Sequence, residues 1–436
     1  MAVQQVHDDV TDLVDRDKLI RWALELSSFY SPTGEERAVA EYLYEEYRKL
    51  GLRAKLQPIS EERYNAIGLL EGSGNGLSLM FNGHLDVSHT GREESLPGGR
   101  HTFASTKPLP EGWPDKPPRV IDDHWLFGAQ VRNMKGAIAA YLGAIDAILR
   151  SGRQLKGDIW IAGVAGEIEK APVDDFRGQR YEGYGAGTKY MIGHGVTADM
   201  CILGEPSTLR VVPGHVGTVW LKLTTRGRLS HPGLARGGHS PIMQMNKIIT
   251  AIEEWIPAYQ DAHMFNNVRP AVNIGAIQGG WPWRVSRTPV YCNLYLDVRT
   301  IPGQHPVDVL QEIQGLIRRL RERDTRLDVE VEMLVSDPAT EIDTGELVCQ
   351  TVCRSHEKVL GTKPEITYMG WASDAIHLNR YGIPTVIYGP GGKSWEGDPE
   401  GGLNYQNIDD LITSAKVYAV SAVDICSRDR NSRSHG

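Results

Sequence analysis

An apolar run that ends in a histidine and a carboxylate constrains this chain more than any other stretch. Residues 77–87 read Leu-Ser-Leu-Met-Phe-Asn-Gly-His-Leu-Asp-Val, a strand-type run that stops at Gly83. Side chains two residues apart in an extended chain point the same way, so His84 and Asp86 can face one pocket at a strand end. There the Asp86 carboxylate would fix or assist the imidazole of His84. Taken alone, this tripeptide favours an ordinary His–Asp pair in a turn, and only the sequence downstream points to a functional site.

Length and charge exclude several classes of protein. With 436 residues the chain is too long for one ordinary core, so two domains are expected. The formal net charge of −8 is modest, and no basic tract suggests binding to nucleic acid. No apolar run is long enough to span a bilayer, and the polar residues 1–17 lack the apolar region of a signal peptide. We therefore expect a cytoplasmic protein without nucleic-acid or membrane partners, whose five cysteines are reduced.

Helical and strand patterns alternate in the two outer parts of the chain. Helices are expected over 17–30, 37–50 and 134–150, and strands over 158–164, 198–203 and 384–388. Asn133 stands where the N-cap of the third helix would be. The second and third of these strand runs are followed by Gly-Glu-Pro and Gly-Pro-Gly-Gly, and the first by Ala-Gly-Glu-Ile-Glu. Because ligands of α/β sheets bind at the carboxyl ends of strands, these segments are candidates for the site.

The middle of the chain has the element order of a small sandwich. Strands are expected over 219–223, 271–277, 290–299 and 327–334, and helices over 241–256 and 307–320. The order β-α-β-β-α-β is that of a ferredoxin-like fold. We therefore predict an α/β protein in which residues 1–213 plus 336–436 form one domain and residues 214–335 are inserted as a second.

Ten short motifs, in order along nearly the whole chain, resemble those of one family. They are Ser31-Pro32-x-Gly34-Glu35-Glu36, Gly83-His84-Leu85-Asp86, Gly128 to Gly136, Glu167 near a strand end, Gly204-Glu205-Pro206, Gly227-x-x-x-His231, Gly279-Gly280, Asp297-Val298-Arg299-x-x-Pro302-Gly303, Ser373-Asp374-Ala375 and Gly389-Pro390-Gly391. The family is that of the zinc-dependent aminoacylases, acetylornithine deacetylases, succinyl-diaminopimelate desuccinylases and carboxypeptidases G. The resemblance implies a zinc-peptidase-like catalytic domain and an inserted lid domain through which two chains form a homodimer.

The resemblance also implies a metal site. In the family, two metal ions share one aspartate, and one ion is bound by the histidine and the acidic residue that correspond to His84 and Glu205. Histidine and carboxylate suit Zn²⁺ or Mn²⁺. The family's general base is the first glutamate of a Glu-Glu pair, which is Glu167 here. Such a base acts together with a metal ion that lowers the pKa of its bound water.

Three departures from the family pattern concern the other metal ion. The bridging aspartate is replaced by Asn133, whose neutral amide bridges two cations poorly. The second glutamate of the pair is Ile168, which cannot bind a metal, although a slip of one residue would bring in Glu169. The family's last ligand, a histidine shortly after Gly-Pro-Gly, is missing, and Glu396 or Glu400 could substitute for it.

Because all three losses fall on one ion, we expect a single divalent metal ion per chain, Mn or Zn. His84 and Glu205 would hold it, with Asn133 or a nearby carboxylate as the third ligand.

The lid supplies candidate substrate contacts. His231 matches the family histidine that reaches the opposite subunit's site and stabilises negative charge on the substrate. Arg284 stands where the family usually has an asparagine, and Arg299 belongs to the Asp-Val-Arg motif; arginines bind carboxylates through a bidentate fork. Trp283 is one of four tryptophans near family pocket motifs, which favours a flat or apolar substrate. The others are Trp281, Trp371 and Trp395.

These features together favour an enzyme: a metal-dependent hydrolase of a C–N bond in a small, carboxylate-bearing and aromatic substrate. One offshoot of the family, 5-nitroanthranilate aminohydrolase, replaces an aromatic amino group with hydroxyl, typically with Mn²⁺, and the lost second ion would suit that chemistry. An aminoacylase, deacetylase or dipeptidase with replaced ligands is the alternative enzyme. A decayed binding protein is a further alternative, against which the retention of His84, Asp86, Glu167 and Glu205 argues.

Overall fold

The computed structural model of the protein describes residues 9–87, 101–102, 105–108, 117–231, 233, 239–391 and 404–430. Two units can be distinguished along the chain. Unit 1 comprises Met1–Pro213, Ile342–Thr367 and Ser373–Gly436, and unit 2 comprises Gly214–Glu341 and Tyr368–Ala372. The second unit is therefore inserted into the first.

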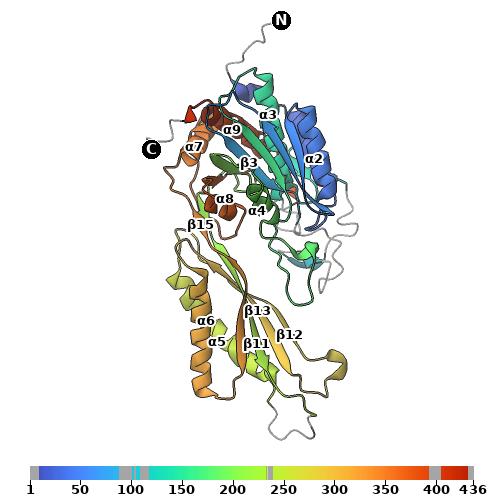
Figure 1. Cartoon of the computed structure of the whole chain (residues 1–436), viewed down its shortest axis with the longest axis vertical. Coiled ribbons are helices and arrows are strands. Elements are labelled where there is room, and N and C mark those ends of the chain that lie inside the picture. The colour runs from blue at the N-terminus through green and yellow to red at the C-terminus, as the bar shows by residue number, and fades with distance from the viewer. Residues whose placement is uncertain are drawn as a thin grey trace. The chain divides into compact units, whose positions relative to one another are not determined.

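A six-stranded mixed sheet forms the centre of unit 1 (Figure 1). Its order is β1 (Arg53–Ser60), β2 (Arg63–Leu70), β8 (Ile159–Val164), β3 (Leu79–His84), β9 (Met200–Leu203) and β16 (Thr385–Ile387). The strands from β8 to β16 run parallel, whereas β1 and β2 are antiparallel to their neighbours. The apolar run that ends at His84 is therefore a central strand, and the carboxyl ends of β8, β3 and β9 lie next to one another.

Alternating side chains of the sheet enter two separate cores. Leu79 and Phe81 of β3 belong to the larger core, and Met80 between them belongs to the smaller one on the other face. The larger core is built with α1 (Arg16–Ser28), α2 (Arg37–Lys49), α3 (Gly136–Arg150), α7 (Leu347–Leu360) and α9 (Ile408–Cys426). Helices α4 (Ala186–Gly193) and α8 (Ala375–Arg380) cover the smaller core. Burial on both faces explains why β3 reads as a continuous apolar run.

The remaining described elements of unit 1 are short. They are η1 (Val10–Leu13), η2 (Val131–Lys135), η3 (Gln179–Tyr181), β4 (His101–Thr102), β5 (Ser105–Pro108), β6 (Arg119–Ile121), β7 (Trp125–Phe127) and β17 (Tyr405–Asn407). Strands β17, β7 and β6 form a small sheet of their own. No helix in the described part of the chain has the length and apolar character needed to cross a membrane.

Unit 2 has the ferredoxin-like order predicted from the sequence. Along the chain come β11 (Gly217–Arg226), α5 (Pro241–Ala262), β12 (Val272–Gly279), β13 (Tyr291–Thr300), α6 (Pro306–Arg323) and β14 (Val329–Asp337), with the short η4 (Pro282–Arg284) after β12. The four strands form an antiparallel sheet in the order β12-β13-β11-β14. Alternate residues such as Leu221 and Leu294 are fully buried against α5 and α6, so the amphipathic pattern of each element selects the side that the helices cover.

The structure differs from the predicted domain limits at two short segments. Residues 336–341 belong to unit 2, because β14 continues to Asp337 and β15 (Thr340–Glu341) pairs with β10 (Gly214–His215). Residues 368–372 also belong to unit 2, where Met369 forms a bridge with His215.

Candidate metal centre

The candidate site lies where three neighbouring parallel strands end. His84 is the last residue of β3, Glu167 follows β8 by three residues, and Glu205 follows β9 by two. Because the sheet order is β8-β3-β9, the glutamates arrive on either side of the histidine. The carboxyl ends of parallel strands are the usual binding edge of such a sheet. The strand order therefore brings together residues as distant along the chain as His84 and Glu205.

His84, Glu167 and Glu205 are close enough to share one cation. The Nε2 atom of His84 is 3.9 Å from Oε2 of Glu167 and 3.8 Å from Oε1 of Glu205. All three offer ligand atoms within 4.8 Å of one another, and no other group of three or more His, Cys, Asp or Glu residues in the described ranges does so. Oδ1 of Asn133 is 3.3 Å from the same Nε2 atom. These four side chains surround one position with nitrogen and oxygen atoms, which is a donor set that suits Zn²⁺ or Mn²⁺.

A buried acceptor without a donor supports the metal interpretation. Oε1 of Glu205 is buried and has no hydrogen-bond donor among the residues that the structure describes. A buried carboxylate oxygen left in this way is costly unless a hydrogen bond or a cation compensates for the lost water. The residues present therefore fit a divalent cation at this position.

The imidazole of His84 is held in the orientation that a metal ligand needs. Its Nδ1 atom is 2.7 Å from the backbone oxygen of Asp86. A carbonyl oxygen only accepts, so in the neutral ring the proton is on Nδ1 and the lone pair of Nε2 faces the glutamates. The Asp86 carboxylate itself is 3.7 Å from Nδ1. The sequence analysis expected the Asp86 carboxylate to fix this ring, whereas in the structure the backbone oxygen of Asp86 makes the closer contact.

The carboxylate of Asp86 instead holds the segment that carries Glu167. Its Oδ1 atom accepts the backbone N–H of Glu167 at 3.0 Å, and Oδ2 accepts the N–H of Ile168 at 3.3 Å. The hydroxyl of Thr33 donates to Oδ2 at 2.8 Å. Asp86 is itself buried, so these three donors compensate for its lost hydration. Ile168 thus contributes a backbone donor while its side chain offers no ligand.

Burial and crowding of like charges perturb the acidic groups. Burial raises the pKa of Glu167 well above its usual range, and the nearby Glu205, Asp374 and Asp86 raise it further. Burial also raises the pKa of Glu205, although His84 lowers it in part. For His84, burial lowers the pKa but Glu205 and Asp86 raise it, and the net direction is upward. A glutamate whose pKa is raised in this way is a suitable general base once a cation offsets the surrounding negative charge.

The candidates for a third ligand differ in how they are placed. Asn133 lies inside η2 and α3 begins only at Gly136, so Asn133 does not cap that helix as predicted. The Asn133–Met134 peptide is cis. Glu169 is half-buried near Glu167 but outside the group of ligand atoms. Glu396 and Glu400 lie outside the described residues.

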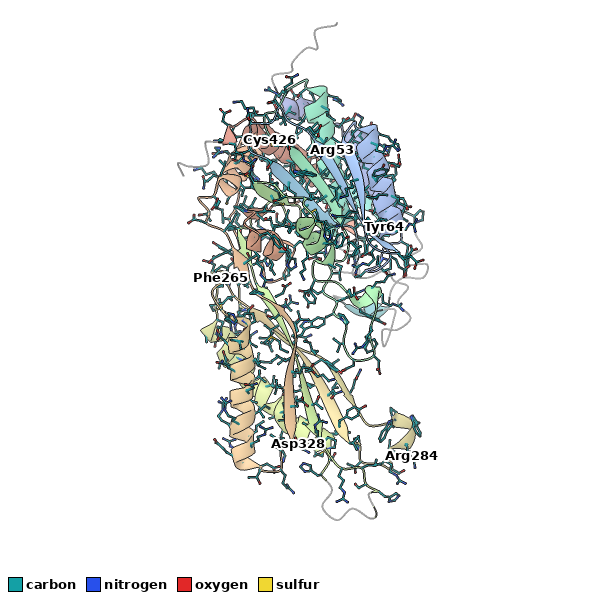
Figure 2. All side chains as sticks on the ribbon, in the orientation of Figure 1. Arg53, Tyr64, Phe265, Arg284, Asp328 and Cys426 are labelled. Carbon is teal, nitrogen blue, oxygen red and sulfur yellow. The ribbon has the colours of Figure 1, made fainter. Side chains whose placement is uncertain are left out.

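The predicted substrate contacts all belong to unit 2. His231 is exposed, and its Nδ1 atom accepts the N–H of Gly233 at 3.2 Å. Trp283 is 77% exposed and lies with Arg284 on η4, in the segment beyond β12 (Figure 2). Arg299 is held within the sheet by Asp297 at 2.8 Å and by Thr218 at 3.1 Å. Their roles towards a substrate stay predictions.

Asp374 is the chief residue that the sequence analysis did not assign to the site. It precedes α8, its side chain is fully buried, and its Oδ2 atom accepts the Thr188 hydroxyl at 2.6 Å. Thr188 in turn accepts a bond from Nδ2 of Asn82 at 3.1 Å. Burial raises the pKa of Asp374 to about 7. Its position in the Ser373-Asp374-Ala375 motif was the available signal, but the motif alone gives no role.

Comparisons with known proteins agree with this architecture. Residues 213–325 match a peptidase dimerisation domain of the M20 family. N-formyl-4-amino-5-aminomethyl-2-methylpyrimidine deformylase from Bacillus subtilis is 25% identical over 95% of this chain and 96% of its own length. Acetylornithine deacetylase from Salmonella arizonae is 26% identical over 79% of this chain and 80% of its own length.

Two solved structures share the fold. A tripeptidase from Staphylococcus aureus superposes with a TM-score of 0.72 at 18% identity and covers 95% of this chain and 100% of its own. A dinuclear metal-binding peptidase of the M20 family from Bacillus subtilis has a TM-score of 0.62 at 15% identity and covers 94% of this chain and 98% of its own. The matched domain, the relatives that span most of the chain and the shared fold agree with the motifs read from the sequence. The chain is thus similar to the M20 peptidases in its matched dimerisation domain, in relatives that span most of its length and in its fold.

Proposed function

We propose that this protein is a metal-dependent hydrolase that cleaves the C–N bond of an amide and releases a small acyl group from an amine. The observation that carries the proposal is the group of buried His84, half-buried Glu167 and buried Glu205 at the ends of three parallel strands. Two relatives that span most of the chain are a deformylase and a deacetylase, which supports amide hydrolysis.

The side chains of the site divide the work of such a reaction. His84 and Glu205 would hold one Zn²⁺ or Mn²⁺ ion, with the Asn133 amide as third ligand. The ion, when bound, supplies the Lewis acidity that polarises a carbonyl and makes water nucleophilic. Glu167 accepts a proton from the attacking water and passes it to the leaving nitrogen, so that amide and water become carboxylic acid and amine. Asp86 keeps Glu167 in place through the backbone bonds described above.

The substrate we propose is small, carries a carboxylate and has a flat ring. The name of the Bacillus subtilis relative describes an N-formylated amine on a pyrimidine. Trp283 offers a flat apolar surface, and Arg284 and Arg299 are the candidate carboxylate partners. His231 would stabilise negative charge on the substrate.

A second candidate is an aminohydrolase that replaces an aromatic amino group with hydroxyl, of the 5-nitroanthranilate type. The observation that favours it is the neutral Asn133 and the apolar Ile168 at positions that would serve a second ion.

Product analysis separates the two candidates. Purified enzyme would be incubated with N-formyl and N-acetyl arylamines and, in parallel, with 2-aminobenzoates. Release of formate or acetate supports the deacylase, whereas release of ammonia from the aminobenzoates supports the aminohydrolase and would overturn the first proposal.

Two acidic neighbours provide a matched test of the general base. Glu167→Gln should lower kcat by at least about 100-fold, because one general base contributes about 10²- to 10⁴-fold, while the metal content stays unchanged. Glu169→Gln is the control two residues away, and it should keep the wild-type kcat. Equal losses in both variants would contradict the assignment of Glu167.

Elemental analysis of wild-type protein should find about one ion per chain, and a value near two would refute the single-ion proposal.

The family match also bears on assembly. We propose a homodimer formed through unit 2, on the basis of the matched dimerisation domain. Light scattering behind a sizing column should give twice the chain mass of 48.3 kDa. A monomer at micromolar concentration would contradict this. The five cysteines are all free, so a reducing agent should not change the measured mass.

A further inference from the structure

A buried ion pair lies beside the segment that carries Glu167. Arg63, the first residue of β2, is 1% exposed, and Glu36 is fully buried. Nε and Nη2 of Arg63 are each 3.2 Å from a different carboxylate oxygen of Glu36, which is a bidentate contact. The N–H of Gly34 donates to Oε1 of Glu36 at 3.0 Å. The pair is therefore fixed at both ends and closed off from water.

The guanidinium of Arg63 also binds a second segment of backbone. Its Nη1 atom donates to the carbonyl of Glu182 at 2.8 Å and, more weakly, to that of Gln179 at 3.4 Å. Gly166 completes the contact, because a Cβ added there would lie 1.8 Å from Nη2 of Arg63. Gly166 has a φ of +69°, a conformation that also favours glycine. Arg63 thus fills the space directly beside the residue that precedes Glu167.

Segments 165–170 and 182–187 are joined to each other as well as to β2. Tyr184 donates its N–H to the carbonyl of Ile168 at 3.2 Å, and Ala186 donates to the carbonyl of Gly166 at 3.0 Å. Asn65, two residues after Arg63 on the same face of β2, accepts the N–H of Ala165 at 3.0 Å and donates to the carbonyl of Gly187 at 2.9 Å. Arg63 and Asn65 therefore hold both segments from one side, while Asp86 holds the N–H groups of the first segment from the other.

Stability alone is a poor explanation for this arrangement. Removing two charges from water costs about as much as their attraction returns, so a buried pair often adds little net stability. The pair instead fixes the positions of four backbone segments relative to one another. They are the turn at Gly34, strand β2, segment 165–170 and segment 182–187. We propose that Arg63, held by Glu36, is a positioning residue that sets where Glu167 stands relative to His84 and Glu205. The inference rests on the proposed function, because Glu167 is taken as the general base.

The test uses the full-length, metal-loaded protein and two kinds of variant. Arg63→Lys keeps the charge but loses the fork. The double variant Arg63→Met/Glu36→Leu removes the pair together and so leaves no unpaired buried charge if the single variant fails to fold. Val352→Ala, which opens a cavity in the larger core away from the site, is the control for loss of stability. Each protein is compared by kcat, KM, metal content and hydrogen exchange of the peptide that covers 165–170.

We expect kcat to fall by about 10- to 100-fold in the Arg63 variants, as for other residues that orient a catalytic group, with metal content and KM nearly unchanged. Amides of 165–170 should exchange faster in these variants, and Val352→Ala should change neither kcat nor this exchange. A folded Arg63 variant with wild-type kcat and exchange would overturn the proposal. If wild-type protein hydrolyses none of the substrates, the proposed function fails, and the exchange of 165–170 alone then decides whether Arg63 positions that segment.

Discussion

Replacing Asp374 by asparagine should stabilise the metal-free protein, and by an amount that grows with pH. Asp374 is 1% exposed, and burial together with Glu205 and Asp86 raises its pKa from 3.8 to about 7. The folded state therefore holds a proton that the unfolded state has lost between these pH values. A carboxyl with a raised pKa contributes stability that is complete below its unfolded pKa and is lost as pH rises through the folded value.

The magnitude follows from the size of the shift. Over the roughly two pH units from pH 5 to the folded pKa of about 7, the folded state holds one proton more than the unfolded state. Each pH unit is then worth about 1.4 kcal/mol, so wild type loses about 3 kcal/mol that Asp374→Asn does not lose. The asparagine has the same shape, and its amide can still bond to the Thr188 hydroxyl, which lies 2.6 Å from the carboxylate in the wild type. The stability advantage of the variant should thus widen by about 3 kcal/mol from pH 5 to pH 8 and then level off.

Urea unfolding of protein dialysed against a chelator measures this directly. Wild type, Asp374→Asn and the exposed control Asp175→Asn would be unfolded at pH 5, 6, 7 and 8 under the same ionic strength. The control should follow wild type at every pH. A difference between Asp374→Asn and wild type that stays constant over this range would refute the assignment of a buried, proton-holding carboxyl.

Three further outcomes follow from the structure. Gly183→Ala should lower kcat by at least about tenfold with metal content retained, because its Cβ would stand 1.7 Å from the carbonyl of Ile168; steady-state kinetics tests this, and Gly193→Ala, whose Cβ meets nothing within 4 Å, should be silent. Leu294→Ala should destabilise the protein by about 2–5 kcal/mol in urea melts, as for other buried leucines, and leave metal binding intact; a loss of metal would contradict the independence of the unit 2 core from the ligand group in unit 1. Chelator should lower Tm more at pH 8 than at pH 6, since the acidic groups with raised pKa ionise as pH rises and then need the cation; calorimetry showing the reverse order would contradict the carboxyl cluster.

The sequence predicts those parts of the molecule that depend on residues close to one another along the chain. Apolar runs locate β3 and β8, and the polar residues that follow them identify His84 and Glu167 as site candidates. The hairpin of β1 and β2 is missed, because its connection contains Glu61 and Glu62 and has none of the glycine or asparagine that usually signals a tight turn.

Contacts between distant segments leave no such local signal. Thr188 and Asp374 are 186 residues apart, and Arg63 lies 119 residues from the carbonyl of Glu182 that it binds. Neither pair produces a periodicity or a spacing that a single sequence displays. The supporting residues of the site therefore appear only when the fold brings the segments together, whereas the candidate ligands are already suggested by their positions at strand ends.

The strand order also has a consequence for the sequence of events during synthesis. His84, Glu167 and Glu205 all precede residue 214, where unit 2 begins, whereas Asp374 and strand β16 follow it. A ribosome that has released the first 205 residues has thus supplied every member of the candidate ligand group, but the sheet still lacks its last strand and the smaller core lacks α8. Pairing of β9 with β16 must wait for the whole insertion, and contacts between such distant segments form slowly. Metal capture by a nascent chain can therefore come before the completion of the domain that buries it.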